Sequence, residues 1–110
     1  MNISAEIKNL CEQISRDFRP ERIILFGSHA SGSPTPNSDV DLLVVMSFEG
    51  SPRQQAVKIR SRIDTSIPLD LLVRTPEQLS ERLAMGDFFV REITESGKVL
   101  YEADHAGVDR

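Results

Sequence analysis

Residues 22–46 read RIILFGSHASGSPTPNSDVDLLVVM, and this stretch predicts two strands joined by a loop. Its first part, Arg22–Phe26, is a short apolar run with β-branched residues, which is typical of a strand buried on both faces. A Gly-Ser pair ends this strand, and Ser31–Ser38 holds two prolines and a glycine, which predicts a loop. A second strand is predicted for Asp39–Met46. Because the connection between the two strands is short, we expect them to pair in antiparallel fashion.

Helices are predicted on both sides of these strands in the sequence. Apolar residues at helical spacing predict a helix over Ile3–Phe18, with Cys11 on its buried stripe. Ser51 and Pro52 combine an N-cap with a first-turn proline, and they begin a second helix. The positions of this helix that we expect to face inward are Ala56, Ile59 and Ile63. Its other side is a basic face that we interpret as solvated, formed by Arg53, Lys58, Arg60 and Arg62.

The C-terminal half continues the alternation of strand and helix. Leu69–Val73 predicts a third strand. The segment Thr75–Gln78 combines an N-cap, a proline and a capping-box glutamine, which predicts a helix that Gly86 ends. The remaining predicted elements are a helix over residues 87–96 capped by Gly97, a strand over Lys98–Tyr101 and a frayed tail from Ala103 to Arg110. The predicted order is therefore α-β-β-α-β-α-α-β.

The composition limits the class of protein. The 110 residues (12.3 kDa) suit one domain, which we place at residues 1–102 with a flexible tail at 103–110. The net charge of -4 opposes nucleic-acid binding, and the longest aliphatic run, Leu42–Met46, is too short to cross a membrane. The single cysteine excludes an internal disulfide, and the N-terminus does not resemble a signal peptide. We therefore expect a cytoplasmic protein.

Three aspartates are candidates for a metal site. Asp39 and Asp41 are two residues apart in a predicted strand, so both carboxylates point to the same face. Two such carboxylates repel each other unless a cation lies between them. Asp70 is the only ionisable residue of the apolar segment 67–73, and a lone charge there requires a partner. A crossover that lays the third strand parallel to the second would bring all three carboxylates to one site, whose hard oxygen ligands suit Mg²⁺.

The Gly-Ser pair at the end of the first strand lies at the same edge of the predicted sheet. Gly27 allows a sharp turn and a close approach to a ligand, and Ser28 with the amides after it can donate hydrogen bonds to phosphate oxygens. Phosphate contacts on one side and a metal on the other indicate a nucleoside triphosphate site. A calcium loop fails at Leu42 and Phe48, and a Walker A loop fails at Ser33.

At these positions the chain resembles the minimal nucleotidyltransferases of the polymerase-β superfamily. The matching segments are Gly27-Ser28, the spacer 29–38, Asp39-Val40-Asp41, Pro68-Leu-Asp70-Leu and Gly97-Lys-Val-Leu-Tyr101. The resemblance implies an α/β (α+β) fold with a mixed β-sheet flanked by helices. It also implies that Asp39, Asp41 and Asp70 are the catalytic and metal-binding residues, with two Mg²⁺ ions, and that Gly27 and Ser28 hold the triphosphate. Relatives often carry arginine where this chain has Ser31.

The resemblance also implies a reaction and a partner. The reaction is transfer of AMP from ATP to an acceptor hydroxyl, with release of pyrophosphate. Because we expect no second domain that could hold a bulky acceptor, the acceptor site would be completed by another protein. In the family this is usually a HEPN-type toxin whose tyrosine is adenylylated, which makes the implied role that of an antitoxin in a hetero-oligomer. Two alternatives stay open: neutralisation of the toxin by binding alone, and nucleotide transfer to a small molecule by a homodimer.

Two further side chains stand out beside these motifs. His29 lies in the predicted phosphate turn, where a histidine is more often solvated than in contact with a nucleotide. Phe88, Phe89 and Val90 cannot all face one core from a single helix, so Phe88 is a candidate contact residue. We favour core packing at a helix junction as the explanation for Phe88.

Overall fold

The computed structural model describes residues 3–35 and 37–103, and its central feature is a four-stranded sheet. The strands lie in the order β3-β2-β1-β4. The elements along the chain are α1 (Ile3–Phe18), β1 (Arg22–Phe26), α2 (Ser28–Ser31), β2 (Val40–Val45), α3 (Pro52–Arg62), β3 (Leu69–Arg74), α4 (Pro76–Ala84), α5 (Phe88–Ser96) and β4 (Lys98–Glu102).

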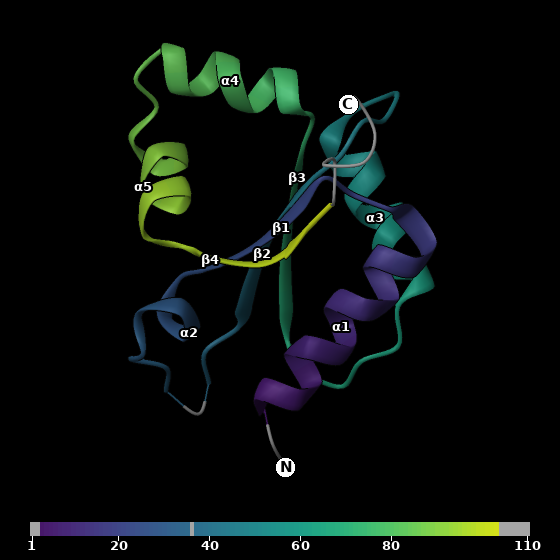
Figure 1. Ribbon diagram of the computed structural model, residues 1–110. Helices are drawn as coiled ribbons and strands as arrows, with labels where there is room; N and C mark the ends of the chain where they lie inside the picture. The colour runs from purple at the N-terminus through teal and green to yellow at the C-terminus, as the bar shows by residue number, and fades with distance from the viewer. Residues whose placement is uncertain (1–2, 36, 104–110) are drawn as a thin grey trace.

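The sheet is mixed, as predicted. Strand β1 pairs antiparallel with β2 on one side and with β4 on the other, and β3 pairs parallel with β2. The parallel pair depends on the crossover through α3, which returns the chain to the same end of the sheet. Figure 1 shows α1 and α3 on one face of the sheet and α4 and α5 on the other.

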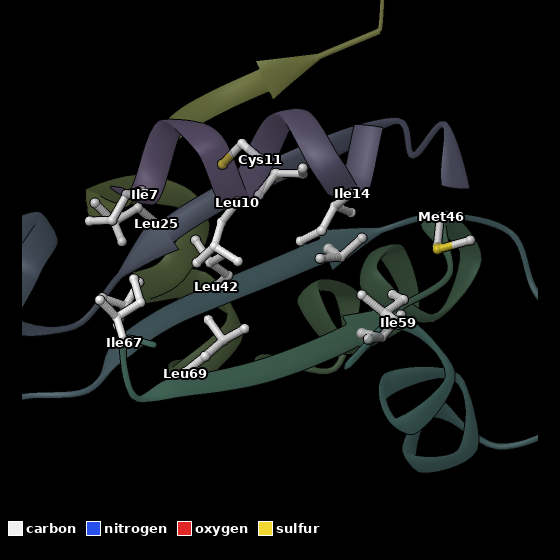
Figure 2. Packing of buried hydrophobic residues seen from close by; sticks show 14 residues of the cluster. Ile7, Leu10, Cys11, Ile14, Leu25, Leu42, Met46, Ile59, Ile67 and Leu69 are labelled. Carbon is white, nitrogen blue, oxygen red and sulfur yellow. The ribbon is translucent and has the colours of Figure 1, made fainter. Parts of the chain in front are cut away.

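The larger core fills the face that α1 and α3 cover (Figure 2). Alternate residues of β1 and β2 point to this face, and they meet the apolar stripe of α1 that the periodicity predicted. Cys11 lies in this core, and burial raises the pKa of its thiol to about 11. The prediction that this cysteine is a core residue is therefore confirmed.

A smaller core lies on the opposite face. The intervening residues of β1 and β2 contact Leu79 of α4 together with Val90 and Ile93 of α5. Both α3 and α4 begin with the predicted capping boxes, in which Ser51 and Thr75 accept from the backbone N–H groups of Gln54 and Gln78. Pairs of hydrogen bonds at each start explain why these two boundaries are sharp.

Several expectations need correction. The segment after β1 is a short helix, α2, which the sequence did not predict. The basic face of α3 is exposed, but the Arg60 guanidinium donates to the carbonyl oxygen of Leu69, so it is not simply solvated. Ala103 is not frayed, because its N–H donates to the Glu21 carbonyl at 2.8 Å. The rest of the predicted tail, residues 104–110, lies outside the described residues.

Two features of α5 also differ from expectation. Gly97 ends α5 in an extended conformation (φ -73°), so it is not a left-handed cap. Glycine is needed there because a Cβ atom would overlap the Ile93 carbonyl oxygen and lie 2.6 Å from Cγ2 of Ile24. The expectation that Phe88 packs in a core at the helix junction is wrong, since Phe88 is 81% exposed, and its neighbour Phe89 is 55% exposed. Among the described residues, no helix has the length and apolar character needed to cross a membrane.

Candidate active site

The turn after β1 brings the backbone of Gly27 against a carboxylate. Gly27 has φ 77° and ψ -157°, a conformation that is essentially restricted to glycine. A Cβ atom at this position would overlap Oδ2 of Asp41 and lie 3.1 Å from its Cγ. The carbonyl oxygen of Gly27 then accepts from the N–H groups of Ala30 and Ser31, each at 3.1 Å. The prediction that Gly27 permits a sharp turn is confirmed, and Asp41 is the group that lies against it in this structure. The predicted close approach to a ligand stays a prediction.

Two of the three predicted aspartates meet on neighbouring strands. Asp41 of β2 and Asp70 of β3 are partners in the parallel register, and both lie near the strand ends closest to Gly27. In-register residues of adjacent strands point to the same face of the sheet, so the two carboxyl groups lie side by side. The crossover predicted from the sequence therefore brings together two of the three carboxylates that we expected at this site.

The electrostatics of Asp41 follow from this pairing. Partial burial raises the pKa of the Asp41 carboxyl above its usual range, and the negative charges of Asp70 and Asp39 raise it further. His29 acts in the opposite direction and lowers this pKa. A hydrogen bond between the carboxyl groups of Asp41 and Asp70, which needs a proton on one of them, adds to the rise. The site thus holds more negative charge than its own cationic groups neutralise.

The remaining predicted residues lie around this pair. Asp39, the residue directly before β2, is exposed, and Ser28 is half-buried at the start of α2. Nε2 of His29 lies 3.4 Å from the carbonyl oxygen of Ser38. The Ser31 hydroxyl donates to the carbonyl oxygen of Ser28 at 3.2 Å. Over the described ranges 3–35 and 37–103, no group of three or more Asp, Glu, His or Cys side chains is placed so that it could hold a metal ion, so Asp39 does not join Asp41 and Asp70 in a preformed three-carboxylate site.

A cavity of about 680 Å³ lies between the Asp41–Asp70 pair and α5, and neither Asp39 nor Ser28 lines it. Gly27, Asp41 and Asp70 line one side of it, and Ser31 also lines it. A larger cavity of about 960 Å³ lies between α1 and β4, and neither Asp41 nor Asp70 lines it. The smaller cavity is therefore the one that Gly27, Asp41 and Asp70 share.

One wall of this cavity comes from residues that the sequence did not assign to the site. They lie on α5 and are Phe89, Glu92, Ile93 and Ser96. Their positions i, i+3, i+4 and i+7 share one face of a helix. The helical spacing of these four residues is visible in the sequence, but the sequence does not indicate which part of the fold this face of α5 would contact.

Comparison with known proteins covers nearly the whole chain. The model of the family described as "Polymerase beta, Nucleotidyltransferase" matches residues 6–106. A Methanocaldococcus jannaschii protein, provisionally named a protein adenylyltransferase, is 27% identical over 105 residues, which are 92% of this chain and 100% of that protein.

Three solved structures share the fold. A provisionally assigned nucleotidyltransferase of Sulfolobus solfataricus has a TM-score of 0.63 at 18% identity, over 89% of this chain and 78% of that one. A toxin-antitoxin complex with AMP-PNP has a TM-score of 0.57 at 24% identity, over 90% of this chain and 76% of the other. An MntA-HepT toxin-antitoxin variant with two Asp-to-Glu substitutions has a TM-score of 0.54 at 23% identity, with the same coverage.

Proposed function

Because the chain belongs to the polymerase β nucleotidyltransferase family, we propose that it transfers AMP from ATP to a hydroxyl group of a partner protein in a Mg²⁺-dependent reaction. The acceptor is a tyrosine of a HEPN-type toxin, which the transfer neutralises. The observation that carries this proposal is the placement of Asp41, Asp70 and the Gly27 turn around one cavity.

The donor set of the site fits a divalent metal. Asp41 and Asp70 offer hard oxygen ligands, and their mutual repulsion is relieved when a cation replaces the shared proton. Mg²⁺ commonly uses one or two carboxylates and completes its coordination with substrate phosphates and water, so a closed protein cage is not required. Asp39, Asp41 and Asp70 would hold the metal. When bound, Mg²⁺ would neutralise the charge that develops on the triphosphate.

Besides holding the metal, the chain's own groups have two tasks in the reaction: they hold the triphosphate and they accept a proton. The acceptor oxygen attacks the α-phosphorus of ATP, the bond from that phosphorus to the bridging oxygen breaks, and pyrophosphate leaves. Gly27 and Ser28 contact the triphosphate and hold it against the end of β1. Asp70, which is exposed on the outer strand β3, takes the proton that the acceptor hydroxyl loses.

Two observations support a protein as acceptor. The relative from Methanocaldococcus jannaschii carries the name of a protein adenylyltransferase, and two structures of the same fold are toxin-antitoxin complexes. Within the described residues, β3 is an outer strand, so the sheet provides no further strand beyond Asp70. A second molecule can therefore reach this carboxylate from the edge of the sheet.

The test uses the whole chain with Mg²⁺, ATP and the protein encoded beside it, followed by intact mass measurement of both proteins. We expect the partner to gain one or more AMP units. The variants Asp41→Asn and Asp70→Asn should lose this gain, whereas Asp17→Asn, a matched change on the exposed side of α1, should keep it.

Other outcomes would favour the alternatives. A stable complex without mass gain, together with toxin neutralisation by Asp41→Asn, would replace the enzymatic proposal with neutralisation by binding. Transfer of AMP to small hydroxyl compounds by the chain alone would identify a small-molecule nucleotidyltransferase instead.

A further inference from the structure

Phe89 is an aromatic side chain in an unusual place. It lines the cavity that Asp41 and Asp70 share, and it is nevertheless 55% exposed. Because Phe89 lines a cavity that also holds two carboxylates, its ring offers a ligand in this cavity an apolar surface beside the polar groups. The proposed AMP transfer assigns no role to this ring.

The position of the ring is well defined. Its centroid lies 5.8 Å from that of Phe26, and the two rings meet edge to face at 83°. The backbone N–H of Phe89 donates to Oδ1 of Asp87 at 3.0 Å, which fixes the first turn of α5. Ile93, one turn further along, is buried in the smaller core and anchors the same helix face. Phe89 is thus braced by its neighbours and still open toward the cavity.

Phe26 connects this ring to the phosphate turn. It is the last residue of β1 and directly precedes Gly27, and both residues line the cavity. A triphosphate held at Gly27 and Ser28 therefore begins next to the aromatic pair. Among the described residues, Phe26 and Phe89 are the aromatic side chains that line this cavity, and Asp41 and Asp70, where the α-phosphate would react, line it as well.

We propose that Phe89, braced by Phe26, is the surface on which the base of the bound nucleotide stacks. This inference rests on the proposed function and names the residue that binds the nucleoside half of its substrate. Stacking requires a flat π-system, which every nucleobase has, so the ring contributes affinity with little preference among bases. A bound base also covers the exposed ring and excludes water from it.

Phe88 provides an internal control. It is the neighbouring residue on α5 and is more exposed, at 81%, but it does not line the cavity. Removal of either ring takes the same number of atoms from the same helical turn. Only the change at position 89 should alter nucleotide binding.

The experiment measures the Kd of two ligands by calorimetry on the whole chain in Mg²⁺. One is an ATP analogue with an α,β-methylene bridge, which cannot release pyrophosphate, and the other is inorganic tripolyphosphate, which lacks the nucleoside. We expect Phe89→Ala to weaken the analogue about tenfold and leave tripolyphosphate unchanged. Phe89→Trp and Phe88→Ala should bind both ligands like the original chain.

A second variant guards against a folding defect. Phe89→Leu keeps apolar contact with Phe26 but removes the π-system, and it should also weaken the analogue alone. The inference is overturned if Phe89→Ala and Phe89→Leu bind the analogue normally, or if they weaken both ligands equally. Failure of the original chain to bind either ligand would overturn the proposed function itself, which keeps the two failures distinct.

Discussion

At Gly27 a single hydrogen atom makes room for a carboxylate. The overlap that a Cβ would create involves only Asp41, whose side chain would have to move away from Asp70. We predict that Gly27→Ala lowers the free energy of unfolding by about 1–3 kcal/mol, because of its backbone conformation, and abolishes ATP binding. Gly32→Ala is the control, since Gly32 also has a positive φ but no atom lies within 4 Å of its Cβ position. It should cost about 1–2 kcal/mol and keep ATP binding in calorimetry. Normal binding by Gly27→Ala would contradict this.

The Asp41 carboxylate is expected to lower the stability of the fold while it serves metal and ATP binding. Because the fold raises the pKa of this carboxyl, its ionised form disfavours the folded state at neutral pH, and protonation at lower pH removes that cost. Without ligand, Asp41→Asn should therefore unfold at a higher temperature, with a gain of a few tenths to about 1 kcal/mol. The thermal shift caused by Mg²⁺ and ATP should disappear in the same variant. A lower melting temperature without ligand would show that Asp41 contributes to the fold in another way.

The N-caps of α4 and α5 allow the effect of a cap on protein stability to be measured separately from its effect on ATP binding. Thr75 caps α4 and Asp87 caps α5, and each side chain accepts from backbone N–H groups of the first turn. Thr75→Ala and Asp87→Ala should each lower the free energy of unfolding by about 1 kcal/mol in urea titrations. Only Asp87→Ala should also weaken ATP binding, because it loosens the turn that carries Phe89. Equal ATP affinities in the two variants would show that the first turn of α5 does not contribute to ATP binding.

The elements also show what the sequence could predict. The starts of α3 and α4 were predictable because Ser51 and Thr75 form capping boxes that depend on four consecutive residues. The short helix α2 was missed, since its four residues include no buried side chain and give no apolar period. The role of Gly97 could not be predicted, because the atoms that crowd it include Ile24, which is distant in the sequence.

The candidate site divides in the same way. Asp41 and Asp70 were predictable as neighbours because a crossover through a helix lays β3 parallel to β2, which brings the starts of both strands to the same end of the sheet. Phe89 was not, because the cavity it faces forms only when α5 packs on the sheet. Sequence motifs therefore identified the groups proposed for catalysis, whereas the proposed base contact came from tertiary packing.

The hydrophobic cores on the two faces of the sheet differ in size. Among the described residues, fourteen form the core under α1 and α3, and six form the core under α4 and α5. The smaller layer should therefore open with the lower free energy. In hydrogen exchange followed by mass spectrometry, amides of α5 should exchange faster than those of α1, and Mg²⁺ with ATP should slow the α5 amides selectively. Equal protection of both helices without ligand would contradict this.

The outer position of β3 has an evolutionary consequence. The groups proposed to bind and activate the nucleotide come from this chain, but the sheet ends at the strand that carries Asp70. If a separate molecule supplies the acceptor beyond that edge, selection can change the acceptor by altering that molecule while the nucleotide chemistry stays intact. A domain of this design can be recruited repeatedly to new targets without the acquisition of a second domain of its own.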